Sequence, residues 1–257
     1  MTFVKKIFKF CKKRIFTSHD EIPEFYKIYK DGNLQQTILD KGLAISKEYN
    51  YIYCRIRKSA NSTVVSTLYN IETKNKIDSL TAIQEIKDNY FTRPSALSKS
   101  EVKQLNNYYK FTIVRNPYNR LWSAYLDKIL PREAIQRKLV IDKLNKNSED
   151  LISFDEFLTF LETGGLRLNS HWAPQIDFLV FPINEYDYIG KIETFKEDLE
   201  KIMFNIFNIE NPEILSIREH KTISNKKALA MTEDQKKRIY TLYKEDFTQL
   251  NYKKDFV

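Results

Sequence analysis

The sequence contains few residues that cross-link or bend a chain. Its 257 residues include two cysteines, five glycines and seven prolines. Cys11 and Cys54 are too few for a disulfide framework, and no CxxC pair or His/Cys cluster suggests zinc, so we expect a reducing compartment and no metal. Scarce glycine and proline argue against low-complexity and repeat architectures. No GxxxxGK[ST] loop is present, which counts against an ordinary ATP- or GTP-dependent kinase.

Long apolar runs are absent as well. No stretch has the uninterrupted apolar length of a signal peptide or a membrane span. Residues 1–16 alternate apolar and basic positions, and a helix would set Phe3, Ile7 and Phe10 on one side and lysines on another. Three interpretations stay open: a solvated basic leader, a helix packed on its own domain, or peripheral contact of residues 1–16 with an acidic membrane. The absence of a membrane-spanning run and the abundance of Lys, Asn and Ile predict a bacterial cytoplasmic protein. Any membrane contact would then be peripheral and at the inner face.

The composition indicates a folded, basic protein. Hydrophobic residues make up 42% and charged residues 30% of the chain, and the 14% aromatic content argues against disorder. The formal net charge is +8, from 42 Lys and Arg against 34 Asp and Glu. Such a charge favours anionic ligands, which include phosphates, sulfated or carboxylated sugars, nucleic acids and acidic membranes. Charge thus selects a class of partner and leaves the chemistry open.

Alternating strand and helix patterns predict an α/β fold. We expect strands over 49–56, 109–114 and 186–192, and helices over 62–71, 117–129, 154–161, 194–207 and 232–250. Such an alternation forms a mainly parallel sheet flanked by helices, with its ligand crevice at the carboxyl ends of the strands. No linker divides the chain. We therefore predict a basic leader and approach segment over 1–48 and one domain over 49–257.

The first predicted strand runs into a helix through a cationic loop, Arg57–Thr63, that reads RKSANST. A loop that leaves a strand and enters a helix directs backbone N–H groups and the positive helix end to one place, where phosphate or sulfate binds well. Lys58, Ser62 and Thr63 lie in this loop, and the small Ala60 lets the backbone approach an anion. The alternative is an ordinary basic residue before a serine-capped helix.

The second predicted strand ends at Arg115, and the following helix begins with Asn116 as its N-cap. Asn116, Arg120 and Ser123 are spaced by four and three residues, which places them near one helix face. Arg115 and Ser123 could grip one phosphate together, the arginine through its planar fork and the serine through its hydroxyl. The structural alternative makes Arg120 a surface ion-pair residue.

The second junction, RNPYNRLWSAY over 115–125, closely resembles the 3′-phosphate-binding segment of carbohydrate sulfotransferases that use 3′-phosphoadenosine 5′-phosphosulfate (PAPS), especially the chondroitin and HNK-1 sulfotransferase group. The loop over 57–63 resembles their 5′-phosphosulfate loop, with Arg57 where that loop usually has proline. Further resemblances, in family order, lie over 169–175, 186–194 and 239–247. The resemblance covers roughly residues 50–252 and implies a P-loop-like, three-layer domain with a central sheet.

The family resemblance implies an enzyme that transfers a sulfuryl group from PAPS to a carbohydrate hydroxyl and releases adenosine 3′,5′-bisphosphate (PAP). Lys58 would be catalytic, because its ammonium can neutralise charge on the leaving phosphate. Arg115 and Ser123 would hold the 3′-phosphate. The residues that would hold the 5′ side are Arg57, Lys58, Ser59, Ala60, Asn61, Ser62 and Thr63. The acceptor would be a polysaccharide, oligosaccharide or glycolipid, for instance an anionic capsular or chondroitin-like glycan.

For the general base we favour His171, because an imidazole titrates near neutrality and the chain has only two other histidines, His19 and His220. The structural alternative is a histidine that caps a loop or orients substrate. Glu193 and Glu85 are weaker candidates, since a carboxylate serves as base in related enzymes. The segment 220–224 loosely resembles a nucleotide-contacting loop, although a solvated loop also fits it.

Two other classes of function compete with sulfuryl transfer. A P-loop-type kinase or phosphotransferase would bind ATP with Mg²⁺ and would normally carry glycine-rich and acidic metal-binding motifs. A non-catalytic basic module that binds nucleic acid or an acidic membrane would explain the charge and the aromatic residues. The missing glycines count against the kinase, and the basic module leaves the paired junctions unexplained, so we expect no nucleic-acid partner.

Overall fold

The computed structural model of the chain describes residues 22–29, 34–77, 79–210, 212 and 231–255. The predicted basic leader over 1–16 and the segment 220–224 lie outside these ranges. The strands are β1 Leu43–Ser46, β2 Tyr51–Cys54, β3 Tyr109–Val114 and β4 Tyr188–Lys191. The α-helices are α1 Glu24–Ile28, α2 Gln36–Gly42, α3 Asn61–Thr73, α4 Leu80–Asn89, α5 Lys99–Gln104, α6 Pro117–Lys128, α7 Arg137–Leu144, α8 Phe154–Phe160, α9 Phe195–Phe207, α11 Glu233–Leu242 and α12 Lys244–Gln249.

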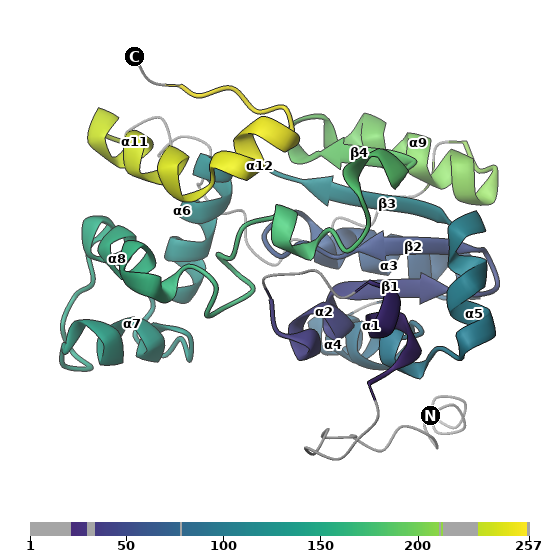
Figure 1. Cartoon of the computed structure of the whole chain (residues 1–257), viewed down its shortest axis with the longest axis horizontal. Helices are drawn as coiled ribbons and strands as arrows, with labels where there is room; N and C mark the ends of the chain where they lie inside the picture. The colour runs from purple at the N-terminus through teal and green to yellow at the C-terminus, as the bar shows by residue number, and fades with distance from the viewer. Residues whose placement is uncertain (1–21, 30–33, 78, 211, 213–230, 256–257) are drawn as a thin grey trace.

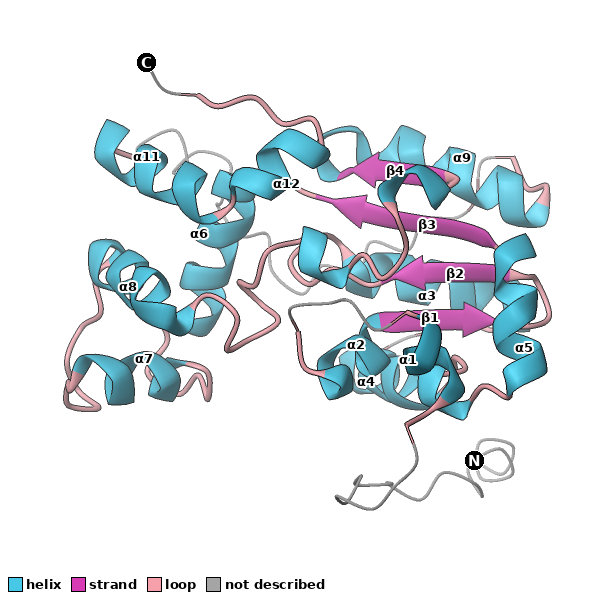
Figure 2. Cartoon of the chain, viewed as in Figure 1, coloured by secondary structure: helices cyan, strands magenta, loops and turns pink. Residues whose placement is uncertain are grey.

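The described strands form one sheet in the order β1-β2-β3-β4 (Figure 2). β1 is antiparallel to β2, whereas β2, β3 and β4 are mutually parallel. The predicted mainly parallel α/β sheet is therefore confirmed. In Figure 1 the carboxyl ends of the three parallel strands point to the same side, toward α6.

Helices cover both faces of the sheet, because alternate residues of each strand point to opposite faces. On one face Ile52 and Cys54 of β2 pack in a cluster with residues of α1, α2 and α5. On the other face Tyr51 and Tyr53 pack with residues of α3, α4 and α9. The result is three layers, as the family resemblance implied.

A third apolar cluster lies beyond the carboxyl ends of the parallel strands. It joins α6, α7, α8, α11 and α12 around Phe157, Phe160 and Trp172. The two phenylalanine rings stack on one another, and each packs edge to face with Trp172. Figure 1 shows this helical part beside the sheet, with α6 between the two. The space between the sheet edge and these helices is where the two predicted junctions lie.

The described segment before residue 49 belongs to the same fold. Strand β1 pairs with β2 through Leu43 and Cys54, and α1 and α2 contribute Phe25 and Leu39 to the core. The predicted boundary between residues 48 and 49 thus falls inside the turn that joins β1 to β2. Four consecutive buried residues, LAIS over 43–46, lack the alternation that marks a strand in sequence.

Apart from their end residues, the predicted helices agree with the structure except for one. The helix predicted over 232–250 is two helices, α11 and α12, separated at Tyr243, whose backbone leaves the helical region with φ −115° and ψ 27°. Tyr243 is buried, and its hydroxyl donates to the Trp172 carbonyl at 2.6 Å. Burial of this side chain in the third cluster therefore accompanies a break that periodicity alone does not reveal.

Candidate functional site

The two strand-to-helix junctions lie side by side at the carboxyl ends of β2 and β3. These strands are parallel neighbours with Cys54 paired to Thr112, so the loops that follow them emerge at one edge of the sheet (Figure 1). The Arg115 guanidinium donates from Nη1 to the Lys58 carbonyl at 3.3 Å. Burial lowers the pKa of Lys58, and the nearby charge of Arg115 lowers it further. The structure thus brings the two predicted anion-binding junctions together.

The loop before α3 presents backbone N–H groups to one place. Lys58 and Ala60 have φ values of 67° and 52°, in the left-handed region that few residues other than glycine adopt. Ala60 is the N-cap of α3, and among the described residues no side chain caps this helix. The first intrahelical bond is made by the Val64 N–H. The N–H groups over 61–63 are therefore available to an anion at the positive helix end.

Two side chains of this loop are used to hold it in place. The buried Ser59 donates from Oγ to Gln175 Oε1 at 3.5 Å. Asn61 Oδ1 accepts a hydrogen bond from Arg55 Nε at 3.2 Å, and Arg55 is itself buried. Because both side chains are hydrogen-bonded within the protein, Ser59 and Asn61 would contact a ligand through their backbone N–H groups.

Ser62 has a cationic neighbour that the sequence did not point to. Lys87, on α4, donates from Nζ to Ser62 Oγ at 2.7 Å. Because Ser62 accepts this bond, its own O–H remains for donation to an anion. Lys87 therefore adds a positive charge beside the N-terminus of α3. It belongs to neither junction motif, and nothing in the sequence of its helix marks Lys87 as a site residue.

The second junction is built around the N-cap of α6. Asn116 Oδ1 accepts from the N–H of Tyr118 at 3.0 Å, as the Asn-Pro pattern predicted. Arg115, just before it, is 9% exposed, and burial lowers its pKa while Glu193 raises it. Ser123 lies two turns along α6 and is buried at 1% exposure. Its part in holding a phosphate stays a prediction.

Glu193, a weaker candidate for the base, lies on the Arg115 side of the site. Its Oε1 accepts from the Asn116 N–H at 2.9 Å and its Oε2 from the Tyr252 hydroxyl at 3.0 Å. Both oxygens are therefore engaged, Oε1 by the second junction and Oε2 by the C-terminal Tyr252. Glu85 is exposed on α4. The described geometry ties neither carboxylate to Lys58.

Arg120 is buried, contrary to the alternative that placed it on the surface. It is 1% exposed and donates to three carbonyls. Its Nε reaches the Arg57 oxygen at 3.0 Å, Nη1 the Ala173 oxygen at 2.8 Å and Nη2 the Ser170 oxygen at 3.4 Å. One guanidinium thus connects α6 to the Lys58 loop and to the segment that carries His171.

Gln175 also connects the two junctions, through hydrogen bonds of its side-chain amide. Its Oε1 accepts from the Arg115 N–H at 2.9 Å, and its Nε2 donates to the Arg115 carbonyl at 2.8 Å. The buried carboxylate of Asp246 accepts from the N–H groups of Gln175 and Ile176, each at 2.9 Å. Burial raises the pKa of Asp246. The fully buried Gln175 amide makes four hydrogen bonds, to Ser59, Arg115 and Asp246, and so fixes the relative position of the Ser59 and Arg115 loops.

The Lys58 ammonium forms an ion pair with Asp127, a residue of α6 that the sequence did not indicate. Lys58 Nζ lies 2.9 Å from Asp127 Oδ2, and Lys128 Nζ lies 3.2 Å from the same oxygen. Burial raises the pKa of Asp127, but hydrogen bonds and charges from Lys58 and Lys128 outweigh it and lower the pKa overall. The site therefore contains one carboxylate between two ammonium groups.

His171 belongs to the same charge cluster. Burial, with the charges of Arg57, Lys128 and Lys58, lowers its pKa to about 2, whereas Asp127 raises it. Its Nδ1 lies 2.7 Å from Asn169 Oδ1, which also accepts the His171 N–H at 3.0 Å. An amide oxygen only accepts, so Nδ1 carries the proton and Nε2 keeps its lone pair. Contrary to the sequence argument, this imidazole does not titrate near neutrality in the protein alone.

The depressed pKa of His171 predicts a pH-dependent stability. Unfolded His171 takes up a proton near pH 6.5, but folded His171 does so near 2, so the unfolded state binds more protons between these values. We expect the free energy of unfolding to fall by up to roughly 2 kcal/mol between pH 6.5 and 5, and less in His171→Gln. Urea unfolding at both pH values measures this. Equal pH slopes for the two proteins would contradict the burial of a neutral imidazole.

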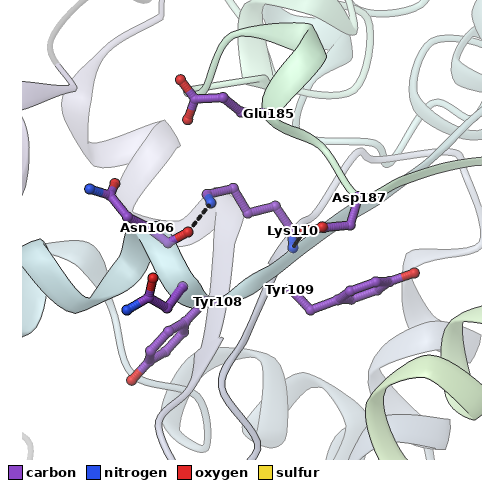
Figure 3. Close-up of a pocket in the computed structure, with 7 residues that line it drawn as sticks. Asn106, Tyr108, Tyr109, Lys110, Glu185 and Asp187 are labelled. Carbon is purple, nitrogen blue, oxygen red and sulfur yellow. Dashed lines mark hydrogen bonds between the residues drawn. The ribbon is translucent and has the colours of Figure 1, made fainter.

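A shallow cavity of about 610 Å³ lies at the opposite edge of the sheet. Lys110, at the start of β3, donates from Nζ to the Asn106 carbonyl there at 3.2 Å, and Asp187 accepts the Lys110 N–H (Figure 3). This cavity is at the amino ends of the parallel strands. It is therefore separate from the junctions at their carboxyl ends.

Within the described ranges, no three His, Cys, Asp or Glu side chains gather in a way that could hold a metal ion. The expectation of a metal-free site stays a prediction. Of the helices that the structure describes, none has the length and apolar character needed to cross a membrane.

The segment that carries these junctions is similar in sequence to known proteins. Residues 41–253 match the family described as the sulfotransferase family. The chain is 28% identical over 197 residues to carbohydrate sulfotransferase 14 of Danio rerio, a match that covers 69% of this chain and 52% of that protein. It is 23% identical over 263 residues to carbohydrate sulfotransferase 11 of Danio rerio, covering 91% and 74%.

A match to carbohydrate sulfotransferase 10 of Xenopus laevis is 26% identical over 199 residues, covering 66% of this chain and 54% of that protein. The chain thus spans about half the length of two of these three relatives. No solved structure matches the chain at a significant level.

Proposed function

The chain belongs to the sulfotransferase family, and from this premise we propose that it transfers a sulfuryl group from PAPS to a hydroxyl of a carbohydrate and releases PAP. The observation that supports this most directly is the contact between the two junctions, where the Arg115 guanidinium donates to the Lys58 carbonyl at 3.3 Å. PAPS carries anions on both its 3′ and 5′ sides. Two neighbouring cationic junctions suit a ligand with two such anionic ends.

The residues present fit the donor. The 5′ side is served by the N–H groups over 61–63 at an α3 terminus that no described side chain caps, and by Lys58, Ser62 and Lys87. The 3′ side is served by Arg115 at the start of α6. A helix N-terminus and charge-assisted donors are what phosphate and sulfate groups bind best.

PAPS supplies the sulfuryl group: its S–O bond to the 5′-phosphate breaks as a new S–O bond forms to the acceptor oxygen. The Lys58 ammonium stabilises the negative charge that develops on the 5′-phosphate oxygen. His171 offers the lone pair of Nε2 to the proton of the acceptor hydroxyl. Bound anions beside Lys58 and Arg57 offset the cations that lower the pKa of His171, so the imidazole becomes a stronger base when the donor is bound.

The family membership favours a carbohydrate acceptor and favours sulfuryl transfer over the kinase and non-catalytic alternatives. The net charge of +8 supports an anionic glycan, such as a capsular or chondroitin-like polymer. A bacterial origin, a cytoplasmic location and a peripheral membrane contact through residues 1–16 stay predictions.

The proposed function is tested by ligand-dependent stability and by transfer. PAP at 100 times its dissociation constant is expected to stabilise the folded protein by about 2.7 kcal/mol, whereas AMP and ATP at equal concentration give smaller shifts in melting temperature. Labelled PAPS is then offered with chemically desulfated glycans, beginning with chondroitin. A protein that responds equally to all three nucleotides and transfers no label would refute the proposal.

Arg115→Ala is expected to remove the discrimination between PAP and AMP. The variant loses charge-assisted hydrogen bonds to the 3′-phosphate, so PAP affinity should fall about 10- to 50-fold while AMP affinity changes little. Isothermal titration calorimetry with both nucleotides measures the difference. Arg132→Ala, which removes an exposed arginine paired with Glu149, is the control. Unchanged PAP affinity in Arg115→Ala would remove the second junction from the donor site.

A further inference from the structure

Asp127 is an anion inside a site for anions. It lies on α6 near the end of the helix, and a quarter of its side chain is exposed. Its Oδ2 is 2.9 Å from Lys58 Nζ and 3.2 Å from Lys128 Nζ. It is also near enough to His171 to raise the pKa of that imidazole. One carboxylate therefore faces the proposed catalytic lysine and contributes to the field at the proposed base.

This position has two opposite physical effects. A carboxylate beside Lys58 repels a phosphate or sulfate that approaches the same ammonium, which weakens nucleotide binding. An ammonium has three N–H donors, however, and the bond to Asp127 uses one of them. The other donors remain for a ligand, and the bond limits the rotation of a long and flexible side chain. A lysine held in this way loses less freedom when it contacts the reacting group.

Resting on the proposed function, we propose that Asp127 is a positioning residue of the donor site: its carboxylate orients the Lys58 ammonium toward the leaving 5′-phosphate and, by its charge, weakens the binding of PAP. The first effect raises the rate of the chemical step. The second effect speeds the departure of the product. Asp127 thus lowers affinity for the nucleotide and raises turnover through one side chain.

The pH profile adds a readout that a merely structural residue would not move. Burial, Lys128 and Arg115 lower the pKa of Lys58, and Asp127 is the group that raises it. Removing the charge of Asp127 lowers the pKa of Lys58 further. Lys58 must be protonated to act, so the alkaline limb of kcat/KM for PAPS moves to lower pH in Asp127→Asn. An unmoved alkaline limb would contradict the coupling of these side chains.

The central experiment uses Asp127→Asn, which keeps the shape of the side chain and removes its charge. PAP binding is expected to become about five- to tenfold tighter, because one repulsive charge is gone. The kcat for transfer from PAPS to desulfated chondroitin is expected to fall about tenfold, because Lys58 is held less firmly. Calorimetry and a label-transfer assay measure the two quantities. Unchanged or weaker PAP binding would overturn the proposal.

Two further variants separate charge from position. Asp127→Glu keeps the charge and moves the carboxylate by one methylene, so PAP affinity should stay within about twofold of the wild type while kcat falls. Asp142→Asn makes the same charge change at an exposed position of α7 and should alter neither quantity. Thermal unfolding establishes that each variant is folded.

The controls also distinguish the two proposals. If Asp127→Asn behaves like Asp142→Asn while the wild type binds PAP and transfers sulfate, the role of Asp127 is wrong and the proposed function stands. A wild type that does not respond to PAP refutes the proposed function, and the role of Asp127 falls with it.

Discussion

Replacing Lys58 with alanine is expected to lower kcat by about 10²- to 10³-fold, the usual cost of removing one group that stabilises charge in a transition state. The ammonium lies at the left-handed turn before α3, is held by Asp127 at 2.9 Å and sits beside the Arg115 junction. Negative charge develops on the 5′-phosphate oxygen only as the S–O bond breaks. Lys58 therefore stabilises the transition state more than it stabilises the bound nucleotide.

The same variant should change PAP affinity by less than about tenfold, because the N–H groups over 61–63 and Lys87 still hold the 5′ side. Label transfer and calorimetry on one preparation give the two numbers. Lys47→Ala, which removes a surface lysine paired with Glu101, should leave both unchanged. If Lys58→Ala loses nucleotide binding and keeps kcat at saturating PAPS, Lys58 binds the donor and does not assist the chemical step.

Arg120→Ala is expected to destabilise the folded protein by about 3 kcal/mol, because it removes three hydrogen bonds from a charged and buried donor. For a chain of this size the melting temperature should fall by roughly 6–12 °C. Arg120 joins the Lys58 loop to the segment over 170–173. Its loss should therefore also displace His171 and lower kcat in the fraction that remains folded.

Arg120→Lys tests the geometry of this contact. A lysine keeps the charge, but its compact ammonium lacks the planar fork that reaches three carbonyls, so most of the destabilisation should remain. Arg132→Ala removes an exposed arginine and should cost no more than about 0.5 kcal/mol. Urea unfolding measures all three variants. An Arg120→Ala protein as stable as Arg132→Ala would show that the buried guanidinium does not hold the loops together.

Local sequence signals predicted the central elements of the fold. The strand over 109–114 matches β3, and the Asn-Pro pair correctly marks the start of α6. These features depend on alternation and on caps, which a chain carries in neighbouring residues. Strand β1 was not predicted, because four buried residues in a row fit a helix as well as a strand. The break at Tyr243 was missed for a similar reason, since it accompanies packing against distant residues.

The sequence likewise predicted only some residues of the candidate site. Lys58, Ser62 and Arg115 were identified from their motifs, and a parallel sheet explains why the two loops meet. Asp127, Lys87 and Gln175 were not identified as site residues, because each acts across a contact between elements far apart in the chain. Asp127 follows the candidate phosphate ligand Ser123 by four residues, a spacing that reveals nothing about its partner Lys58.

The sequence by itself determined the two cationic strand-to-helix junctions and the order of the elements, because residue type, alternation and capping are local properties. The tertiary structure alone decided the charge environment of the site. Burial of His171 beside Arg57, Lys58 and Lys128 makes its imidazole a neutral group, and Asp127 comes to face Lys58 only when α6 packs against the loop before α3. Such effects depend on distance and desolvation, and both are set by folding.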